Sequence, residues 1–478
     1  MSAKVNTQHK DYAAMIAKWQ RCRDTVSGQD AVHAAGETYL PKLKDQSTDD
    51  YNAYVKRAQF YNAVWRTISA LSGMIFRKVP VIDVTDSISK FLEDVTMGGV
   101  NFHTFAQQTS IEILTSGRRG ILVDYPQEST TGKTLAEVEK MGLRPTMQAY
   151  NAETIINWKT TRINNQTMLS MVVLTEDAEI ATDSEFEVKT ETHYRVLDLV
   201  YRSVNDGGGL AYRVRLYRIN DKKEDELIDE LIPLMNGKPL DYIPFYFIGI
   251  DDTTPDVDEP PLIDLVDVNL DHYRLDADYK HGLHFTGLPT AVVSGYTPEE
   301  KSEKLYVGSS SAWVFPDPQA KAAFLEYTGQ GLQAIEKAKQ SDEQQMAILG
   351  ARLLSSEKKD AETAQTAQIH RAGESSILSA IAQTISIGLT KALNTFCEWA
   401  GSPGEWSIEL NRDFLPIEMT PQELTVILQS WQAGLPGFSD QGVFDMLQKR
   451  EVVATDVTLE EEQERIKNKP IPTPPVVE

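Results

Sequence analysis

Long helical segments dominate the sequence after residue 260, and they constrain the fold more than any other feature. The stretch PPLIDLVDVNLDHYRLDADYKHGLHF, about 260–286, reads as one uninterrupted helix. A second long helix starts near Gly331 and runs to about Gly350, and a third covers about 361–399. The short insertion between the first two carries strand and turn signals. The sequence from 260 to 399 is therefore predicted to be mainly helical.

The first of these helices has two faces with different chemistry. Its apolar side chains recur at three- and four-residue steps, as a buried stripe would: Leu262, Val266, Leu270, Tyr273 and Ala277. A second set forms what we call the acidic stripe: Asp264, Asp267, Asp271 and Asp278. From 251 to 278 there are ten acidic residues against one basic residue, Arg274. Two interpretations remain open: a solvated face of a surface helix, or a helix in a ring whose acids face a shared lumen.

The first 259 residues predict an α+β domain. Helical periodicity covers about 8–35, 48–78 and 102–116. The segments MVVLTED, EVKTETHYRVLDLV and AYRVRLYRIN are rich in β-branched and aromatic residues, which favours strands. NDGGG between the last two is typical of a hairpin loop, and YIPFYFIGI reads as a short buried strand. We expect an antiparallel or mixed sheet flanked by the earlier helices.

The composition limits the classes of function. A net charge of −23 argues against a protein that grips nucleic-acid phosphates over a broad basic face. Two cysteines, Cys22 and Cys397, are too few for a disulfide framework and suit a reducing cytosol. The N-terminus lacks an apolar signal-peptide region, and the uncharged stretch 375–390 is too short to cross a bilayer. We therefore expect a soluble intracellular protein with no membrane partner.

The stretch GILVDYPQESTTGKTLAEVEK has the order of strand, loop, GKT and helix that a phosphate-binding loop uses. Its spacing is wrong, because Gln127 occupies the position where the motif needs its first glycine. Pro126 also removes a backbone donor from the region that would wrap the phosphates. Gly132 is better explained as a turn residue. We expect no nucleotide cofactor and no ATPase activity.

One group of residues within 271–284 could hold a metal ion. His272 and Asp276 are four residues apart and could share a helix face, as could His281 and His284. A third ligand would have to converge on one of these pairs. A metal-dependent hydrolase is therefore kept as an alternative function, while the preferred interpretation needs no metal or other cofactor.

The end of the chain is helical at 421–432 and 440–449. A charged run, EEEQERIKNK, then precedes the tail PIPTPPVVE. Its prolines predict an extended, disordered terminus.

The order of all these segments resembles the portal proteins of tailed bacteriophages, in particular a branch long described only as a domain of unknown function. Three stretches carry the resemblance: YNAVWRTISALSGMIFRKVP, then GILVDYP with RPTMQAYNAETIINW, then IDLVDVNLDHYRLDAD. They are colinear, and the resemblance covers the chain up to about residue 460. It implies a ring of subunits, usually a dodecamer, that sits at one capsid vertex and has no enzymatic activity.

The resemblance also implies how the chain is divided and what it contacts. The parts are a wing (1–259 and 361–415), two stem helices (260–286 and 329–350), a clip (287–328), a tunnel loop (351–360), and a crown with the disordered tail (416–478). The ring would be the channel for genome packaging and ejection. Its partners would be double-stranded DNA, the terminase, the head–tail adaptor, the capsid and the scaffolding protein. It would belong to the virion and, during assembly, to the host cytoplasm. Another adaptor component of the virion is the remaining alternative.

Candidate functional residues follow from that division. The acidic stripe would line the channel and repel DNA phosphates, so that the duplex moves without being held. Three basic residues belong to the tunnel loop: Arg352, Lys358 and Lys359. The lysines would touch DNA transiently, although solvated loop charges also explain such a pair. The clip has four aromatic residues that would form a subunit or partner interface: Tyr296, Tyr306, Trp313 and Phe315. The last two would share one face of a strand.

Overall fold

The computed structural model divides the chain into two units, residues 1–355 with 376–411 and residues 356–375 with 412–478. The described residues are 4–126, 142–180, 185–203, 208–287, 290–295, 319–325, 329, 331–352, 377–414, 421–449, 452–453 and 457–468. Most of the predicted wing and both predicted stem helices fall in the first unit. The division into wing, stem, clip and crown remains a prediction.

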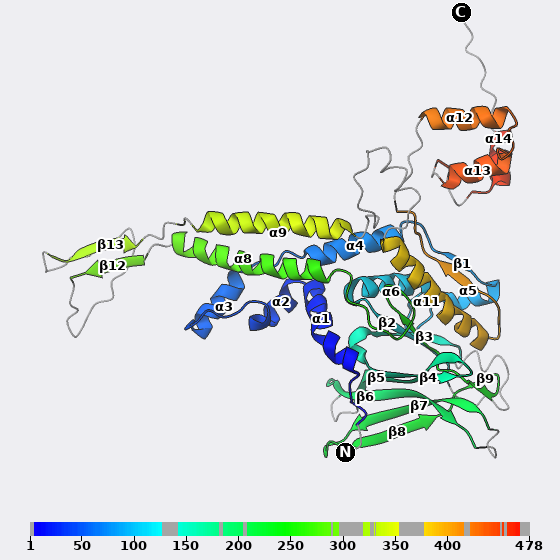
Figure 1. The fold of residues 1–478 in the computed structure, drawn as a ribbon, viewed down its shortest axis with the longest axis horizontal. Coiled ribbons are helices and arrows are strands. Elements are labelled where there is room, and N and C mark those ends of the chain that lie inside the picture. Colours follow the sequence, from blue (N-terminus) through cyan, green and yellow to red (C-terminus); the bar gives the residue numbers. More distant parts are fainter. Residues whose placement is uncertain are drawn as a thin grey trace, which may run out of the picture. The chain divides into compact units, whose positions relative to one another are not determined.

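The first unit opens with a series of helices, coloured blue to cyan in Figure 1. They are α1 (Lys10–Ser27), α2 (Gln29–Ala34), α3 (Thr48–Arg57), α4 (Ala63–Ile75), α5 (Asp86–Leu92) and α6 (Phe102–Ser116). Ser47, Asn62 and Asn101 each accept a backbone N–H at the start of the helix that follows. Helix α6 ends at Gly117, whose φ of 78° is the left-handed conformation that glycine adopts easily.

The long helix predicted after residue 48 is in fact two helices, α3 and α4, joined by an extended segment. Side chains of a distant helix stabilise the interruption. Asp276 accepts the backbone N–H of Gln59 at 2.9 Å, and the Asn269 side chain accepts that of Ala63 at 3.1 Å. The prediction was wrong because these partners lie more than 200 residues away in the sequence, and local periodicity carries no trace of them.

A three-stranded antiparallel sheet lies against α6 and the later helix α11 (Ile377–Trp399). It has the order β11-β2-β3, from β2 (Arg119–Asp124), β3 (Thr146–Asn151) and β11 (Phe245–Ile248). Strand β2 is the predicted ILVDY strand, and β11 is the predicted YIPFYFIGI strand. Gly120 of β2 has no room for a side chain, since a Cβ there would lie 2.2 Å from Cζ of Phe245.

A five-stranded antiparallel sheet follows in sequence order. Its strands are β4 (Ile155–Ile163), β5 (Gln166–Ile180), β6 (Lys189–Tyr201), β7 (Leu210–Ile219) and β8 (Asp225–Leu231). The pairing of Tyr201 with Leu210 confirms the predicted hairpin. Two further short pairs are β9 (Leu234–Met235) with β10 (Lys238–Pro239), and β1 (Val81–Asp83) with β14 (Ser407–Glu409). The α+β fold class is confirmed.

Two long helices and a hairpin follow the sheets. Helix α8 (Ile263–Gly287) leads to β12 (Thr290–Ser294), which pairs with β13 (Lys321–Leu325), and α9 (Leu332–Arg352) follows. Figure 1 shows α8 and α9 side by side, with the hairpin beyond one end of the pair. Helix α11 (Ile377–Trp399) returns to the body and buries its apolar face. The helices predicted at 260–286 and 331–350 are thus confirmed to within a few residues.

The second unit contains α12 (Pro421–Gln432), α13 (Asp440–Lys449) and α14 (Leu459–Lys467). The first two have the predicted bounds. Helix α14 lies in the charged run and begins with a capping box, in which Thr458 and Glu461 satisfy each other's backbone N–H groups. The predicted disordered tail, PIPTPPVVE (470–478), lies outside the described residues.

Candidate functional site: the α8–α9 helix pair

The apolar stripe of α8 is buried, as its spacing predicts. Leu262, Val266, Leu270, Tyr273 and Ala277 all lie within the body of the chain. Helices α1, α3, α4 and α9 contact α8 and cover this stripe from several sides. The stripe therefore attaches the helix to the rest of its own chain.

The acidic stripe is exposed along α8. Asp267 forms an ion pair with Nε of Arg21 in α1 at 3.2 Å, and Asp271 lies 3.4 Å from Nη1 of Arg274. Tyr54 of α3 donates its hydroxyl to Asp278, and burial together with this hydrogen bond raises the pKa of Tyr54 above its usual range. Side chains of the same chain thus neutralise part of the negative charge of the acidic stripe or hydrogen-bond to it. Exposed pairs of this kind are weak, so the stripe keeps an acidic character.

Helix α9 runs antiparallel to α8. Leu332 near its start lies against Gly282, Lys339 forms an ion pair with Asp276, and Oε1 of Glu343 lies 3.4 Å from Nε2 of His272. Among the described side chains of α9, only Asp342 and Met346 are buried. Helix α9 therefore packs against α8 along a narrow strip, and most of its side chains are exposed or half-buried.

Asp276 is the main polar contact between the two helices. Lys339 and Lys280 form ion pairs with its carboxylate, which also accepts the N–H of Gln59. Burial alone would raise the pKa of Asp276, but these hydrogen bonds outweigh it and hold the pKa below its ordinary value. The carboxylate is charged and fully engaged at neutral pH, so its role is to join α8, α9 and the segment between α3 and α4.

A cavity of about 520 Å³ lies between α4, α8 and α9. Its polar lining includes Tyr61, Arg66, His272 and Glu343. Arg66 is exposed and fixed in direction, because its Nη1 donates to the Tyr61 hydroxyl at 2.9 Å and its guanidinium stacks 4.6 Å from the ring centre. His272 is buried at the base of the cavity.

The possible metal ligands do not converge. Asp276 is occupied by two lysines, whereas His281 stacks edge-on against Tyr54 and contacts Arg57. His284 stacks against Phe285. In the described part of the chain no three or more His, Cys, Asp or Glu side chains come together as a metal site would require.

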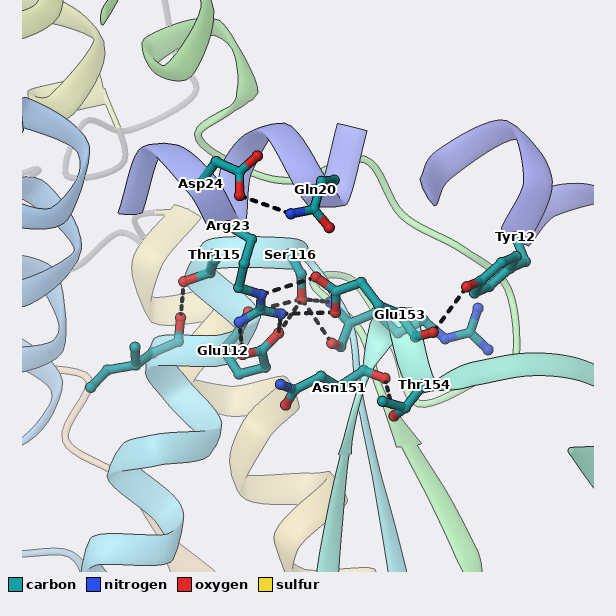
Figure 2. A network of polar contacts seen from close by, with 12 residues as sticks. Tyr12, Gln20, Arg23, Asp24, Glu112, Thr115, Ser116, Asn151, Glu153 and Thr154 are labelled. Atoms are coloured by element: carbon teal, nitrogen blue, oxygen red, sulfur yellow. Dashed lines mark hydrogen bonds and ion pairs between the residues drawn. The ribbon is translucent and has the colours of Figure 1, made fainter. Parts of the chain in front are cut away.

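A partly buried ionic network that sequence analysis missed joins α1, α6 and the short turn Ala152–Thr154 (Figure 2). Arg23 donates Nη2 to Glu112 at 2.6 Å and to Glu153 at 2.8 Å, and Ser116 donates to Glu112 at 2.8 Å. Burial alone would lower the pKa of Arg23. The hydrogen bonds and negative charges of the two carboxylates outweigh that effect and raise the pKa above its ordinary value. All three charges are paired, so the network stabilises the fold and offers no free acid or base. Its members are 89 and 130 residues apart, too far for a spacing rule.

A fully buried arginine in the body contacts aromatic rings instead of carboxylates. Arg118, 1% exposed, lies over Trp158 at 4.0 Å and over Phe247 at 4.5 Å. Burial lowers its pKa to about 9. Its guanidinium nitrogens have no hydrogen-bond partner among the described residues. The ring faces therefore supply the electrostatic compensation that a carboxylate normally supplies.

Several predicted residues lie outside the described residues. These are the four clip aromatics Tyr296, Tyr306, Trp313 and Phe315, the tunnel-loop Lys358 and Lys359, and Gln127 and Gly132 of the GKT stretch. Arg352 is the last residue of α9. Within the described chain, no helix has the length and apolarity needed to cross a membrane. Cys22 and Cys397 are buried free thiols, and burial raises the pKa of each to about 12.

Comparison with known proteins gives one family match. A family described as "Domain of unknown function (DUF4055)" matches residues 261–400, the segment from α8 to α11 and less than half of the chain. A search of curated proteins finds no match.

Three solved structures show a distant similarity. The first is titled "Virion of native gene transfer agent (GTA) particle", with 12% identity over 93% of this chain and 100% of that chain, and a TM-score of 0.36. The "Neck of empty GTA particle computed with C6 symmetry" has 11% identity over 85% and 90%, at 0.36. The "Neck of native GTA particle computed with C12 symmetry" has 10% identity over 87% and 98%, at 0.35. TM-scores below 0.5 do not establish a common fold.

Proposed function

We propose that this protein is the portal subunit of a tailed phage or phage-like particle. Copies of the chain assemble into a closed ring at one capsid vertex, and the lumen of the ring is the channel for double-stranded DNA during packaging and ejection. A dodecamer is the expected form. The ring contacts the terminase, the head–tail adaptor, the capsid and the scaffolding protein, first in the host cytoplasm and then in the virion.

One observation carries the proposal. Helices α8 and α9 form an antiparallel pair with the β12–β13 hairpin between them in sequence, and this arm follows an α+β body. This is the order of wing, stem, clip and stem that the sequence resemblance implies. The match to residues 261–400 falls on the same arm and on α11, and so supports treating them as one unit.

The charges of α8 fit a conduit for DNA. Asp264, Asp267 and Asp271 are exposed on one side of α8, while the apolar stripe is buried against the body. In the proposed ring, these acids and Asp278 line the lumen. Each lysine–phosphate contact adds affinity that moving DNA would have to break, whereas carboxylates repel the backbone and keep the duplex centred. The role is structural, and we expect no catalytic activity.

The clip and tunnel loop complete the proposal. The aromatic pair Trp313 and Phe315 would contact neighbouring subunits or a docking partner at the clip. Arg352, Lys358 and Lys359 would lie at the narrowest part of the channel, where brief contacts with phosphates are tolerable because few charges take part.

Electron microscopy of the purified full-length protein tests the proposal. End-on views should show rings of identical subunits around a hole wide enough for a DNA duplex. A second experiment adds the double variant Trp313→Ala/Phe315→Ala, which should weaken ring closure or adaptor binding while the wing stays folded. A wild-type protein that remains monomeric at every concentration and salt would contradict the proposal.

A further inference from the structure

The segment before α1, residues 4–9, contacts both outer strands of the five-stranded sheet, and we call it the strap. At β8, the backbone N–H of Val5 donates to the Asp225 carboxylate at 2.8 Å. At β4, the side-chain amide of Asn157 donates to the carbonyl of Thr7, also at 2.8 Å. These two strands are the first and last of the sheet. The strap therefore ties the two outer strands to each other.

His9 fixes the strap at the point where it enters α1. Its backbone N–H donates to the carbonyl of Ile156 in β4 at 2.8 Å. Its ring stacks on Trp158 of the same strand, with the ring centres 4.1 Å apart. Its Nδ1 accepts the backbone N–H of Asp11 at 3.3 Å and so caps α1. One residue thus joins the strap, the sheet and the first turn of α1.

Only the neutral ring of His9 can make all of these contacts. An imidazole nitrogen that accepts a hydrogen bond carries no proton, so the proton of the neutral ring is on Nε2. Protonation would turn Nδ1 into a donor that faces the N–H of Asp11, and the cap of α1 would be lost. The half-buried ring would also have to carry its charge partly out of water.

The charges around His9 also favour the neutral ring. The guanidinium of the buried Arg118 lies 4.0 Å from the ring centre of Trp158, the same side chain on which His9 stacks. Lys10 adds a second positive charge beside it. The half-exposed carboxylate of Asp11 acts the other way, with Oδ2 3.5 Å from Nδ1. Burial, helped by Lys10 and Arg118, outweighs Asp11 and holds the pKa of His9 below its ordinary value of 6.5.

We propose that His9 is a pH-sensitive latch, whose protonation releases the strap from the five-stranded sheet. Histidine is the side chain that ordinarily gains its charge just below neutral pH. The closed strap binds the proton less readily than the released strap does. It is therefore stable above pH 6.5 and is lost progressively as the pH falls below that value. The hydroxyl of Tyr12 donates to the carbonyl of Glu153 at 2.9 Å, a contact that does not involve His9, so α1 stays attached while the strap opens.

Hydrogen exchange of the full-length protein tests the latch. Exchange of the amides of residues 5–11 is measured at about pH 8 and about pH 5, and corrected for the intrinsic effect of pH on exchange. Loss of a helix cap corresponds to about a fivefold change in a local opening equilibrium, so the corrected exchange should be about fivefold faster at the lower pH. Amides of α6 should be equally protected at both values, which shows that the body remains folded.

Histidine variants separate the latch from other titrating groups. His9→Asn keeps a capping side chain that cannot be protonated, so the strap should stay closed at both pH values. His9→Ala has neither the cap nor the stacked ring and should exchange quickly at both. His103→Asn, in α6, removes a histidine that stacks on Phe76 and should leave the pH dependence of the strap unchanged.

Two results would overturn the latch. One is equal corrected exchange of the wild-type strap at the two pH values. The other is the same release by acid in His9→Asn, because a group other than His9 would then control the strap. The latch lies within a single chain, so either result leaves the proposed ring untouched.

Discussion

Arg23 and Asp342 are both charged side chains placed between helices, but only Arg23 finds its partners within its own chain. Around Arg23, two carboxylates and a serine complete every charge, and α1, α6 and the turn Ala152–Thr154 are held together as a result. Along α9, by contrast, Asp342 is unpartnered and most side chains are exposed. The Arg23 network is complete within the chain, whereas Oδ2 of Asp342, like the guanidinium of Arg118 in the body, has no hydrogen-bond partner among the described residues.

The largest effect is expected from breaking the network of the body. Arg23→Ala leaves the buried Glu112 and the partly exposed Glu153 without their cation, which should lower the free energy of unfolding by about 2–3 kcal/mol. Chemical denaturation measures it. Arg21→Ala removes only the exposed pair with Asp267 and should cost about 1 kcal/mol or less. Equal losses for the two variants would refute the contrast between buried and exposed pairs.

A pair of glycine substitutions compares packing in the two regions. Gly120→Ala places a Cβ 2.2 Å from Phe245 in the closely packed body and should cost about 1–3 kcal/mol. Gly282→Ala meets the end of the Leu332 side chain, on a helix that can yield, and gains about 1 kcal/mol of helix propensity. Thermal unfolding should thus show a loss for the first variant and no loss for the second. A larger loss at Gly282 would mean that the arm is packed as tightly as the body.

The acidic stripe gives a functional test of the arm. Replacing Asp264, Asp267 and Asp271 together with lysine should slow DNA passage by about tenfold at low salt, because each lysine adds a phosphate contact. Raising the salt should reverse part of the effect. Ring assembly should change less than DNA passage, as judged from packaging assays beside electron microscopy. Unchanged packaging would show that these acids do not face the DNA.

Two aspartates should make stability depend on pH in opposite directions. The expected change in the free energy of unfolding is smaller than for the variants above. The folded pKa of Asp276 is lowered, so its contribution is present above the ordinary value of 3.8 and is lost as the pH falls through the folded value. The folded pKa of Asp342 is raised, so an unassembled subunit should lose stability as the pH rises through the range above 3.8. Asp342→Asn should remove that second loss, which denaturation of dissociated subunits at several pH values measures. An identical pH profile for variant and wild type would contradict this assignment.

The smallest effect is expected at the GKT stretch. Lys133→Ala should leave packaging and ring formation unchanged, because Gln127 replaces the glycine that a phosphate-binding loop requires. Purified rings should hydrolyse no ATP. ATP hydrolysis that the substitution abolishes would show that the spacing argument is wrong.

The sequence predicted what depends on local periodicity and not what depends on distant partners. The bounds of α8 and α12 followed from apolar spacing and breakers. The interruption between α3 and α4 did not, since Asp276 and Asn269 create it from α8. The acidic stripe was visible as a pattern, but the pairing of Asp267 with Arg21 was not.

The candidate site shows the same limit. Helical spacing placed His272 and Asp276 on one face and suggested a metal. It could not show that Lys339 and Lys280 occupy Asp276. Nor could it reveal that Asp342 is buried without a partner, because burial of that side chain depends on how α9 lies on α8.

Hydrogen exchange in assembled and dissociated protein tests the central claim most directly, namely that a neighbouring copy completes the α8–α9 arm. Amides of β2 and β3 should be equally protected in both states, because the body is complete in a single chain. Amides of α9 should exchange quickly in dissociated subunits and at least tenfold more slowly in the assembled form. Equal protection of α9 in both states would contradict the account.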